Sequence, residues 1–253
     1  MKSFREYLQE NKFLVVAHRG ASGNYPENTI VAYNEALKHG IQILEIDVRL
    51  TRDNEIVAFH DEILNRIANI NSPIEELSTK EIANIDVGKW FGNNFTEKIP
   101  TLREVIDIIK DKAYLIIELK SNNNNREFFS KKLFEIINER NFNDFILLAS
   151  FDAGLIKLIK QNHPSALACI IRDPNSNKLP HKLIDETNAD GVICSIDELN
   201  DELISDIKIN KIPVGVYDVD TVEQLTKCLQ ANVLGIGTNY PQRILSNLKN
   251  GKI

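Results

Sequence analysis

The sequence lacks the features that mark disulfide-rich and membrane-spanning proteins. It has only three cysteines in 253 residues, an odd number without metal-type spacing, which favours free thiols in a reducing compartment. No apolar run approaches the roughly 20 residues that a membrane-spanning helix needs. The N-terminal segment carries charges of both signs instead of a signal-type apolar stretch. We therefore expect a cytoplasmic protein without stable membrane insertion.

Positive charge is also scarce. Thirty Lys and Arg residues stand against 36 Asp and Glu residues, a formal net charge of -6. The basic residues are scattered and form no stripe, which argues against a nucleic-acid partner. The sequence has no G-x-G-x-x-G phosphate loop. We therefore expect the partner to be a small molecule. The sequence does not indicate the oligomeric state.

Strand-like apolar runs alternate with helical patterns along the whole chain. Residues 13–17 form the first run and 28–38 the first helical pattern. Further runs lie at 43–48, 56–59, 114–119, 145–149, 166–171, 191–194, 213–217 and 233–237. Helices are predicted over 101–111, 126–140, 152–161, 198–209, 221–230 and 241–249. This α/β pattern predicts a parallel sheet covered by helices, and its length favours a (β/α)8 TIM barrel over an open sheet.

One pair of runs breaks the alternation. Only seven residues separate 43–48 from 56–59, and a parallel crossover needs about a dozen or more. The two runs are therefore predicted to form an antiparallel hairpin. Its return would bring His60 beside Ile43 and Glu45, and so next to a carboxylate.

Residues 62–100 contain no strong strand and are too long for an ordinary barrel loop. We expect a small insertion subdomain that shapes the active-site mouth, with one helix near 78–84. The catalytic barrel would then comprise 1–61 and 101–253. The Asn-rich run at 122–125 is predicted to be a loop.

Three carboxylates lie inside apolar runs, where charged side chains are rare unless paired or bound to metal. Glu45 and Asp47 are two apart and share a face of one strand, and Glu118 lies in another. Converging carboxylates repel unless a cation lies between them, and oxygen ligands select one Mg²⁺ or Ca²⁺ ion over zinc. The alternative is a set of structural ion pairs with nearby cations, namely Arg19, Arg49 or Lys120.

Two histidines follow apolar runs close to these acids. His18 comes after 13–17 and His60 after 56–59. Imidazoles titrate near neutral pH, so one can take a proton while the other gives one, as phosphodiester cleavage requires. Arg19 and Lys120 supply positive charge for a phosphate.

These residues lie in motifs that resemble the glycerophosphodiester phosphodiesterase family, a phospholipase-C-like phosphodiesterase barrel. The resemblance runs in order over nearly the whole chain, and the string of motifs is highly specific. The motifs are His18-Arg19-Gly20, Pro26-Glu27-Asn28-Thr29, Glu45-x-Asp47-Val48, Thr51-x-Asp53, His60-Asp61, Gly88-Lys89-Trp90-Phe91, Ile99-Pro100-Thr101-Leu102, Glu118-Leu119-Lys120, Ser150-Phe151 and Thr238-x-x-Pro241.

The resemblance implies metal-dependent hydrolysis of deacylated phospholipids, such as glycerophosphocholine, to glycerol 3-phosphate and an alcohol, a reaction of lipid and glycerol metabolism. Water and the glycerol 2-hydroxyl both stay open as the nucleophile. The implied roles are metal binding by Glu45, Asp47 and Glu118, acid–base catalysis by His18 and His60, and phosphate contact by Arg19 and Lys120.

The chain departs from the family pattern at two places. Asn239 stands where Asp is common, and Tyr217-Asp218-Val219-Asp220 stands where Trp-Thr-Val-Asn is usual. Tyr217 is expected to line the wall that a glycerol or head group meets, so these departures bear on substrate preference. One rival function is a lysophospholipase D-like enzyme, which would need an apolar channel or a membrane-facing surface, and the sequence shows no obvious amphipathic membrane helix. Another is a non-catalytic binding protein on the same fold.

Overall fold

The structure is a computed structural model that describes residues 1–121 and 125–249. Within these residues, eight parallel strands form a closed barrel: β1 (Leu14–Ala17), β2 (Ile43–Leu50), β4 (Tyr114–Leu119), β5 (Ile146–Ser150), β6 (Ala168–Ile171), β7 (Gly191–Ser195), β8 (Val214–Tyr217) and β9 (Gly235–Thr238). The barrel closes because β1 pairs in parallel with both β9 and β2. The predicted (β/α)8 barrel is thus confirmed. The predicted loop at 122–125 falls mostly on residues 122–124, outside the described residues.

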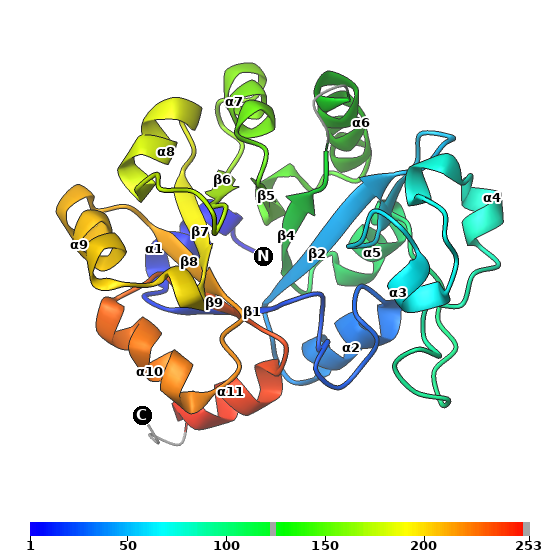
Figure 1. Cartoon of the computed structure of the whole chain (residues 1–253), viewed down its shortest axis with the longest axis horizontal. Coiled ribbons are helices and arrows are strands. Elements are labelled where there is room, and N and C mark those ends of the chain that lie inside the picture. Colours follow the sequence, from blue (N-terminus) through cyan, green and yellow to red (C-terminus); the bar gives the residue numbers. More distant parts are fainter. Residues whose placement is uncertain (122–124, 250–253) are drawn as a thin grey trace.

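Helices cover the outside of the barrel as a ring (Figure 1). They are α2 (Ile30–Lys38), α5 (Leu102–Ile109), α6 (Arg126–Glu139), α7 (Ala153–Asn162), α8 (Pro180–Thr187), α9 (Asp201–Asn210), α10 (Val222–Ala231) and α11 (Pro241–Lys249), with the 3₁₀ helices η2 (Asn143–Phe145) and η3 (Ile196–Glu198) between them. Helix α8 is absent from the sequence prediction. The sequence feature that marks the start of α8 is Pro180 in its first turn. Proline suits this position because the missing N–H has no hydrogen-bond partner within the helix there.

A short N-terminal helix, α1 (Phe4–Glu10), also escaped prediction. It begins with a capping box in which the Ser3 hydroxyl accepts from the Glu6 amide and the Glu6 carboxylate accepts from Ser3. Phe4 is fully buried and stacks on Tyr114, at the start of β4, with 4.7 Å between ring centroids. Helix α1 therefore covers the N-terminal end of the barrel (Figure 1).

The predicted hairpin is present, but its register differs from the expectation. Strand β3 (Ile56–Ala58) pairs antiparallel with β2, with Val48 opposite Ala58. The Phe59 amide donates to the Asp47 carbonyl at 3.0 Å. The prediction that His60 returns beside Ile43 and Glu45 is therefore wrong. Strand β2 runs two residues further than predicted, so the returning strand pairs further along it and His60 comes close to Asp47.

Residues 62–100, all of which the structure describes, contain no strand and three short helical turns: α3 (Asn65–Ala68), η1 (Ile74–Glu76) and α4 (Thr79–Ile82). The last of these lies where the helix near 78–84 was predicted. This segment and β3 share an apolar core that is separate from that of the barrel, formed by Val57, Phe59, Leu64, Ile67, Ile74, Ile82, Val87 and Ile99. The division into a barrel and an insertion subdomain stays a prediction.

Across the described part of the chain, no helix is both long enough and apolar enough to cross a bilayer.

Candidate active site

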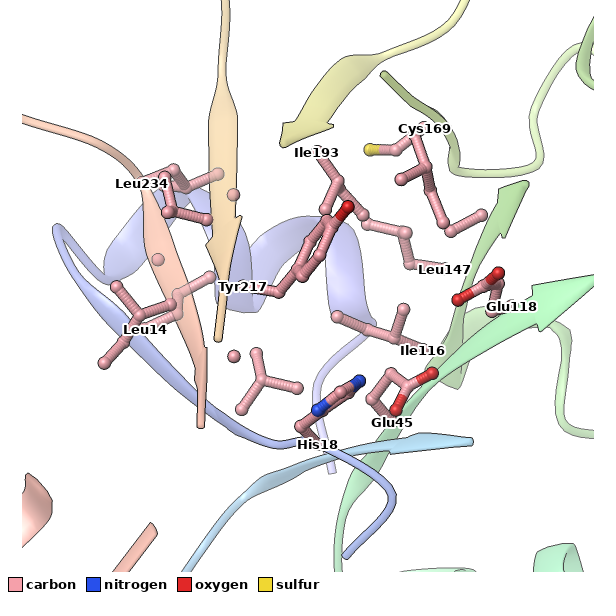
Figure 2. Close-up of a pocket in the computed structure, with 18 of the residues that line it drawn as sticks. Leu14, His18, Glu45, Ile116, Glu118, Leu147, Cys169, Ile193, Tyr217 and Leu234 are labelled. Atoms are coloured by element: carbon pink, nitrogen blue, oxygen red, sulfur yellow. The ribbon is translucent and has the colours of Figure 1, made fainter. Parts of the chain in front are cut away.

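The predicted site residues gather at the carboxyl-terminal end of the barrel, where barrel enzymes place their active sites. His18 follows β1, His60 follows β3, and Tyr217 ends β8. A pocket of about 310 Å³ opens between these elements. Its polar lining consists of His18, Arg19, Glu45, His60, Glu118, Lys120, Tyr217 and Asp218. Figure 2 shows His18, Glu45, Glu118 and Tyr217 around the pocket. Asp47 lies beside this pocket and is fully buried.

The three carboxylates converge. Glu45 and Asp47 project from the same face of β2, and Asp47 is paired in register with Glu118 of β4. One oxygen atom from each of the three side chains lies within 4.8 Å of the others, and all three residues are buried. The cluster therefore brings together the trio that the sequence marked as possible metal ligands.

Burial and mutual repulsion disfavour three negative charges here. Burial, and after it the charge of Asp47, raises the pKa of Glu45 to about 8 and that of Glu118 to about 7. Burial also acts to raise the pKa of Asp47, but Arg19 and Lys120 outweigh it and hold this pKa below its usual range. Arg19 and Lys120 thus offset only part of the negative charge of the trio, and its all-oxygen donor set fits a hard divalent cation.

Two cations already contact the cluster. The Arg19 Nε lies 3.0 Å from Asp47 Oδ2, and the Lys120 Nζ lies 3.0 Å from Asp47 Oδ1 and also contacts Glu118. The structural ion pairs left open by the sequence therefore exist for Asp47 and Glu118. Arg49 is not one of these partners, since its Nε donates to the His60 carbonyl at 2.9 Å.

Glu45 is the acid without such a partner. Its Oε2 accepts the Arg19 backbone N–H at 2.8 Å, and no ion pair to it occurs in the described part of the chain. The loop that aims this amide is tightly held, because a Cβ on Gly20 would come within 2.7 Å of the Ala32 carbonyl carbon. Arg19 itself has a left-handed backbone with φ 54°. This local geometry leaves Glu45 facing the pocket and short of positive charge.

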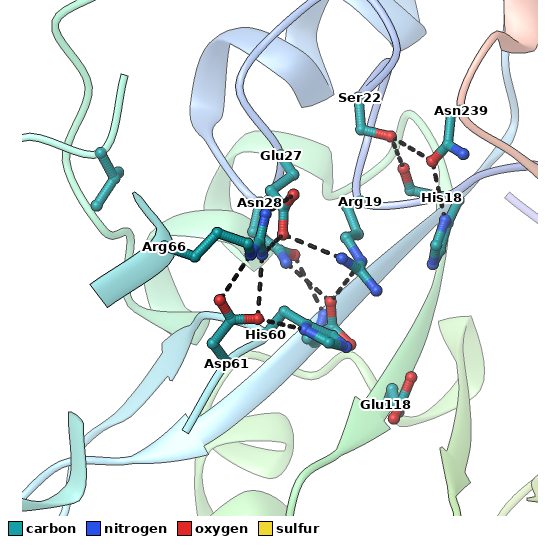
Figure 3. A network of polar contacts seen from close by, with 12 residues as sticks. His18, Arg19, Ser22, Glu27, Asn28, His60, Asp61, Arg66, Glu118 and Asn239 are labelled. Carbon is teal, nitrogen blue, oxygen red and sulfur yellow. Dashed lines mark hydrogen bonds and ion pairs between the residues drawn. The ribbon is translucent and has the colours of Figure 1, made fainter. Parts of the chain in front are cut away.

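Asn28 is a site residue whose role the sequence analysis missed. Its Nδ2 donates to Asp47 Oδ2 at 2.9 Å, and its Oδ1 accepts the Asp47 backbone N–H at 3.2 Å (Figure 3). The Tyr33 hydroxyl also donates to Asn28 Oδ1 at 3.2 Å. Asn28 therefore fixes the Asp47 carboxylate from behind. The sequence feature that could have pointed to this role is the position of Asn28 within the Pro26–Thr29 motif.

His18 is held through one ring nitrogen. Its Nδ1 lies 3.0 Å from Asn239 Oδ1 and 3.0 Å from Asp218 Oδ1. Both atoms are hydrogen-bond acceptors, so Nδ1 carries hydrogen and Nε2 is left for the pocket. Burial acts to lower the pKa of His18, but the hydrogen bond to Asp218 and the charge of Glu45 outweigh it and raise this pKa to about 9.

His60 is held in a similar way from the other side of the site. Its Nδ1 lies 2.7 Å from Asp61 Oδ1, and Arg66 in turn donates to Asp61 Oδ2 at 2.7 Å (Figure 3). Arg66 also bonds both oxygens of Glu27, whose Oε1 accepts from Arg19 at 3.0 Å. Burial lowers the pKa of His60. The remaining histidines, His39, His163 and His181, do not line the pocket.

Below the polar residues the pocket is apolar. It extends down the barrel interior as far as Phe4 and Leu8 of α1. Gly215 lines this part, and a Cβ there would meet only Ile193 Cγ1, at 3.5 Å. Barrel interiors are normally filled by side chains. Here small residues on the strands leave an apolar space beneath the carboxylates.

The fold is a closed barrel, and the site holds buried acids and two imidazoles at the barrel mouth. Together they indicate the class of protein, a hydrolase built on a barrel. Comparison with known families narrows this class of protein to a single family. Residues 18–243 match the model of the glycerophosphoryl diester phosphodiesterase family. The chain belongs to this family, as its motifs predicted.

Relatives match over almost the whole chain. A glycerophosphodiester phosphodiesterase of Caldanaerobacter subterraneus subsp. tengcongensis is 32% identical over 95% of this chain and 99% of its own. A putative glycerophosphodiester phosphodiesterase of Bacillus subtilis is 30% identical over 94% and 99%. A phosphodiesterase of Oleispira antarctica, solved in complex with its product sn-glycerol-3-phosphate, superposes with a TM-score of 0.87 at 27% identity, covering 93% of this chain and 96% of that one. The predicted enzyme class, a glycerophosphodiester phosphodiesterase, is confirmed.

Proposed function

We propose that the protein hydrolyses glycerophosphodiesters to sn-glycerol 3-phosphate and an alcohol, with His18 and His60 as the proton-transfer pair. Glu45, Asp47 and Glu118 would hold one Mg²⁺ or Ca²⁺ ion. The observation that carries the proposal is the convergence of both histidines on one pocket mouth beside the carboxylate trio. The family assignment supports the substrate class.

The surroundings of the two rings assign them different tasks. His18, with its raised pKa, is protonated at neutral pH and donates its Nε2 proton to the departing alcohol oxygen. His60, with its lowered pKa, is neutral and accepts the proton of the attacking hydroxyl, whether from water or from the glycerol 2-position. Asp61 keeps hydrogen on Nδ1 of His60, so Nε2 is the accepting nitrogen.

Arg19 and Lys120 line the pocket and offset the charge of the phosphate, as the sequence analysis predicted for them. Glu45, Asp47 and Glu118 would hold the cation, which would supply Lewis-acid polarisation of the phosphoryl oxygens. The chain presents three carboxylates that are already held in place: Asn28 bonds Asp47, the Arg19 amide bonds Glu45, and Lys120 bonds Glu118.

Removal of divalent cations tests this proposal. Protein treated with EDTA is expected to lose glycerol 3-phosphate release from glycerophosphocholine, and Mg²⁺ or Ca²⁺ should restore it more fully than Zn²⁺, because the ligands are all oxygens. The assay is repeated with the ethanolamine, glycerol and inositol diesters to find the preferred head group. Unchanged turnover in EDTA, with metal content shown to be zero, would contradict the assigned metal site.

The apolar lower pocket favours a second candidate, the lysophospholipase D-like activity. A glycerol carries hydroxyls that the lining of Leu, Ile and Val side chains cannot bond, whereas a single acyl chain matches that lining. The whole pocket, polar mouth included, has a volume of about 310 Å³, roughly twice that of the ~150 Å³ engineered cavity that stays dry and binds benzene. An acylated substrate could thus place its phosphate at the carboxylates and its chain beneath them.

Partial filling of the lower pocket separates the two candidates. Gly215→Val adds methyl groups where a Cβ meets no backbone, so it should lower the ratio of kcat/KM for lysophosphatidylcholine to kcat/KM for glycerophosphocholine by about tenfold. Gly92→Ala, which meets only the Phe95 ring and lies outside the pocket, is the control. No lysophosphatidylcholine turnover by the wild type would eliminate this candidate.

The thiols support the proposed cytoplasmic location. Cys169, Cys194 and Cys228 are free and buried, and burial raises the pKa of each thiol to about 12. Such thiols are poor nucleophiles and metal ligands. They agree with the reducing compartment expected from the cysteine count.

A further inference from the structure

The acceptors around His18 differ in charge. Asn239, from the loop after β9, is neutral, and Asp218, from the loop after β8, carries a carboxylate. Each places an Oδ1 atom 3.0 Å from the same His18 nitrogen. Neither residue belongs to the carboxylate trio, and the sequence analysis connected both positions only with substrate preference.

Asn239 is fixed with its oxygen toward His18. Its Nδ2 donates to Asp220 Oδ2 at 2.7 Å and its backbone N–H to Asp220 Oδ1 at 2.8 Å. The amide therefore cannot present its nitrogen to the ring. Its Oδ1 is also shared with the Ser22 hydroxyl, 2.8 Å away (Figure 3). Asn239 thus offers the ring an acceptor but supplies no charge.

Asp218 differs from Asp61, the partner of His60. Asp61 forms an ion pair with Arg66, which it shares with Glu27. In the described residues, the one side chain that forms an ion pair with Asp218 is His18. The charge of Arg19 acts on Asp218 only from a distance, without an ion pair. An imidazolium beside a carboxylate is stabilised more strongly than one beside a neutral amide, since charge-assisted hydrogen bonds are about twice as strong as neutral ones.

We propose that Asp218 is the positioning residue for His18, fixing its tautomer and stabilising its protonated ring, with Asn239 as a neutral second acceptor. The proposal rests on the proposed function, because it assumes that His18 transfers a proton. In this role Asp218 holds hydrogen on Nδ1, keeps Nε2 aimed at the pocket and carries the compensating charge.

Asp218→Asn tests the charge with little change of shape. It should lower kcat for glycerophosphocholine by about 10- to 100-fold while KM changes little, because the group acts through His18 and not on the substrate. A merely structural role predicts instead a lower melting temperature with unchanged kcat. Retention of kcat within about twofold of wild type would overturn the proposal.

Relocation of the carboxylate gives a sharper readout. In the triple variant Asp218→Asn, Asp220→Asn, Asn239→Asp, the charge moves to the other atom that lies 3.0 Å from Nδ1. The change at 220 keeps one amide and one carboxylate in the 220–239 pair. Most of the lost kcat should return. The matched control is Asp218→Asn with Asp220→Asn, which lacks any carboxylate on Nδ1 and should stay slow.

Nitrogen-15 NMR of the His18 ring reports the tautomer without an activity assay. Wild type and triple variant should show hydrogen on Nδ1, and the double-variant control should show a larger share of the Nε2–H form. A triple variant as slow as the control, although folded by thermal melting, would refute the proposal. Full activity of His18→Ala would instead refute the proposed function, so the two failures are distinguishable.

Discussion

His18→Ala and His60→Ala are each expected to lower kcat for glycerophosphocholine by about 10²–10⁴-fold, the usual contribution of a positioned acid or base. The two rings reach the pocket from different strands, His18 after β1 and His60 after β3, so neither ring can replace the other. The double variant should lose little more than the worse single variant, because residues that act as a unit are not additive. Initial rates of glycerol 3-phosphate release measure the effect.

A third histidine provides the control for these variants. His39 ends α2 and pairs with Glu35 away from the pocket, so His39→Ala should keep wild-type kcat. Thermal melting shows whether each variant is folded. If both His18→Ala and His60→Ala turn over substrate at the wild-type rate, the acid–base assignment is wrong, whatever the metal dependence.

Glu45→Gln is expected to abolish metal-dependent activity and, in EDTA, to raise the melting temperature. Glutamine keeps an acceptor for the Arg19 amide while removing the charge. The folded-state pKa of Glu45, about 8, lies above its unfolded value near 4.5. Ionisation above pH 4.5 therefore penalises the folded state, and the penalty grows until the pH passes about 8. The melting-temperature gain of the variant should follow that same rise from pH 5 to pH 8 and then level off.

In EDTA the variant should have the higher melting temperature, but the rise in melting temperature on adding a divalent cation should be smaller for the variant than for wild type. Mg²⁺ or Ca²⁺ bound to the folded wild type stabilises it by mass action, and Glu45→Gln should show little or no such gain. Glu10→Gln, which removes a surface carboxylate paired with Lys2, is the matched control and should keep the full response. A metal-induced shift in Glu45→Gln equal to that of wild type would show that Glu45 is not a ligand.

Local signals in the sequence were sufficient for most of the fold. Alternating apolar runs and helical periodicity predicted the eight parallel strands and most of the helices. Helices α1 and α8 escaped because they are short and begin with signals of only a few residues, the Ser3 capping box and Pro180. Charged residues inside apolar runs marked Glu45, Asp47 and Glu118, because burial makes isolated charges costly and therefore informative.

The sequence by itself determined the barrel and the family and marked the acids and histidines of the proposed site, because these depend on short-range patterns and on motifs. Only the tertiary structure decided which groups face one another. Hairpin register placed His60 near Asp47 instead of Glu45. Barrel closure through β1 and β9 placed Asn239 and Asp218 on His18, some 200 residues earlier in the chain. The closure of the sheet determines these pairings. The spacing of residues along the chain does not, so no local sequence pattern predicts them.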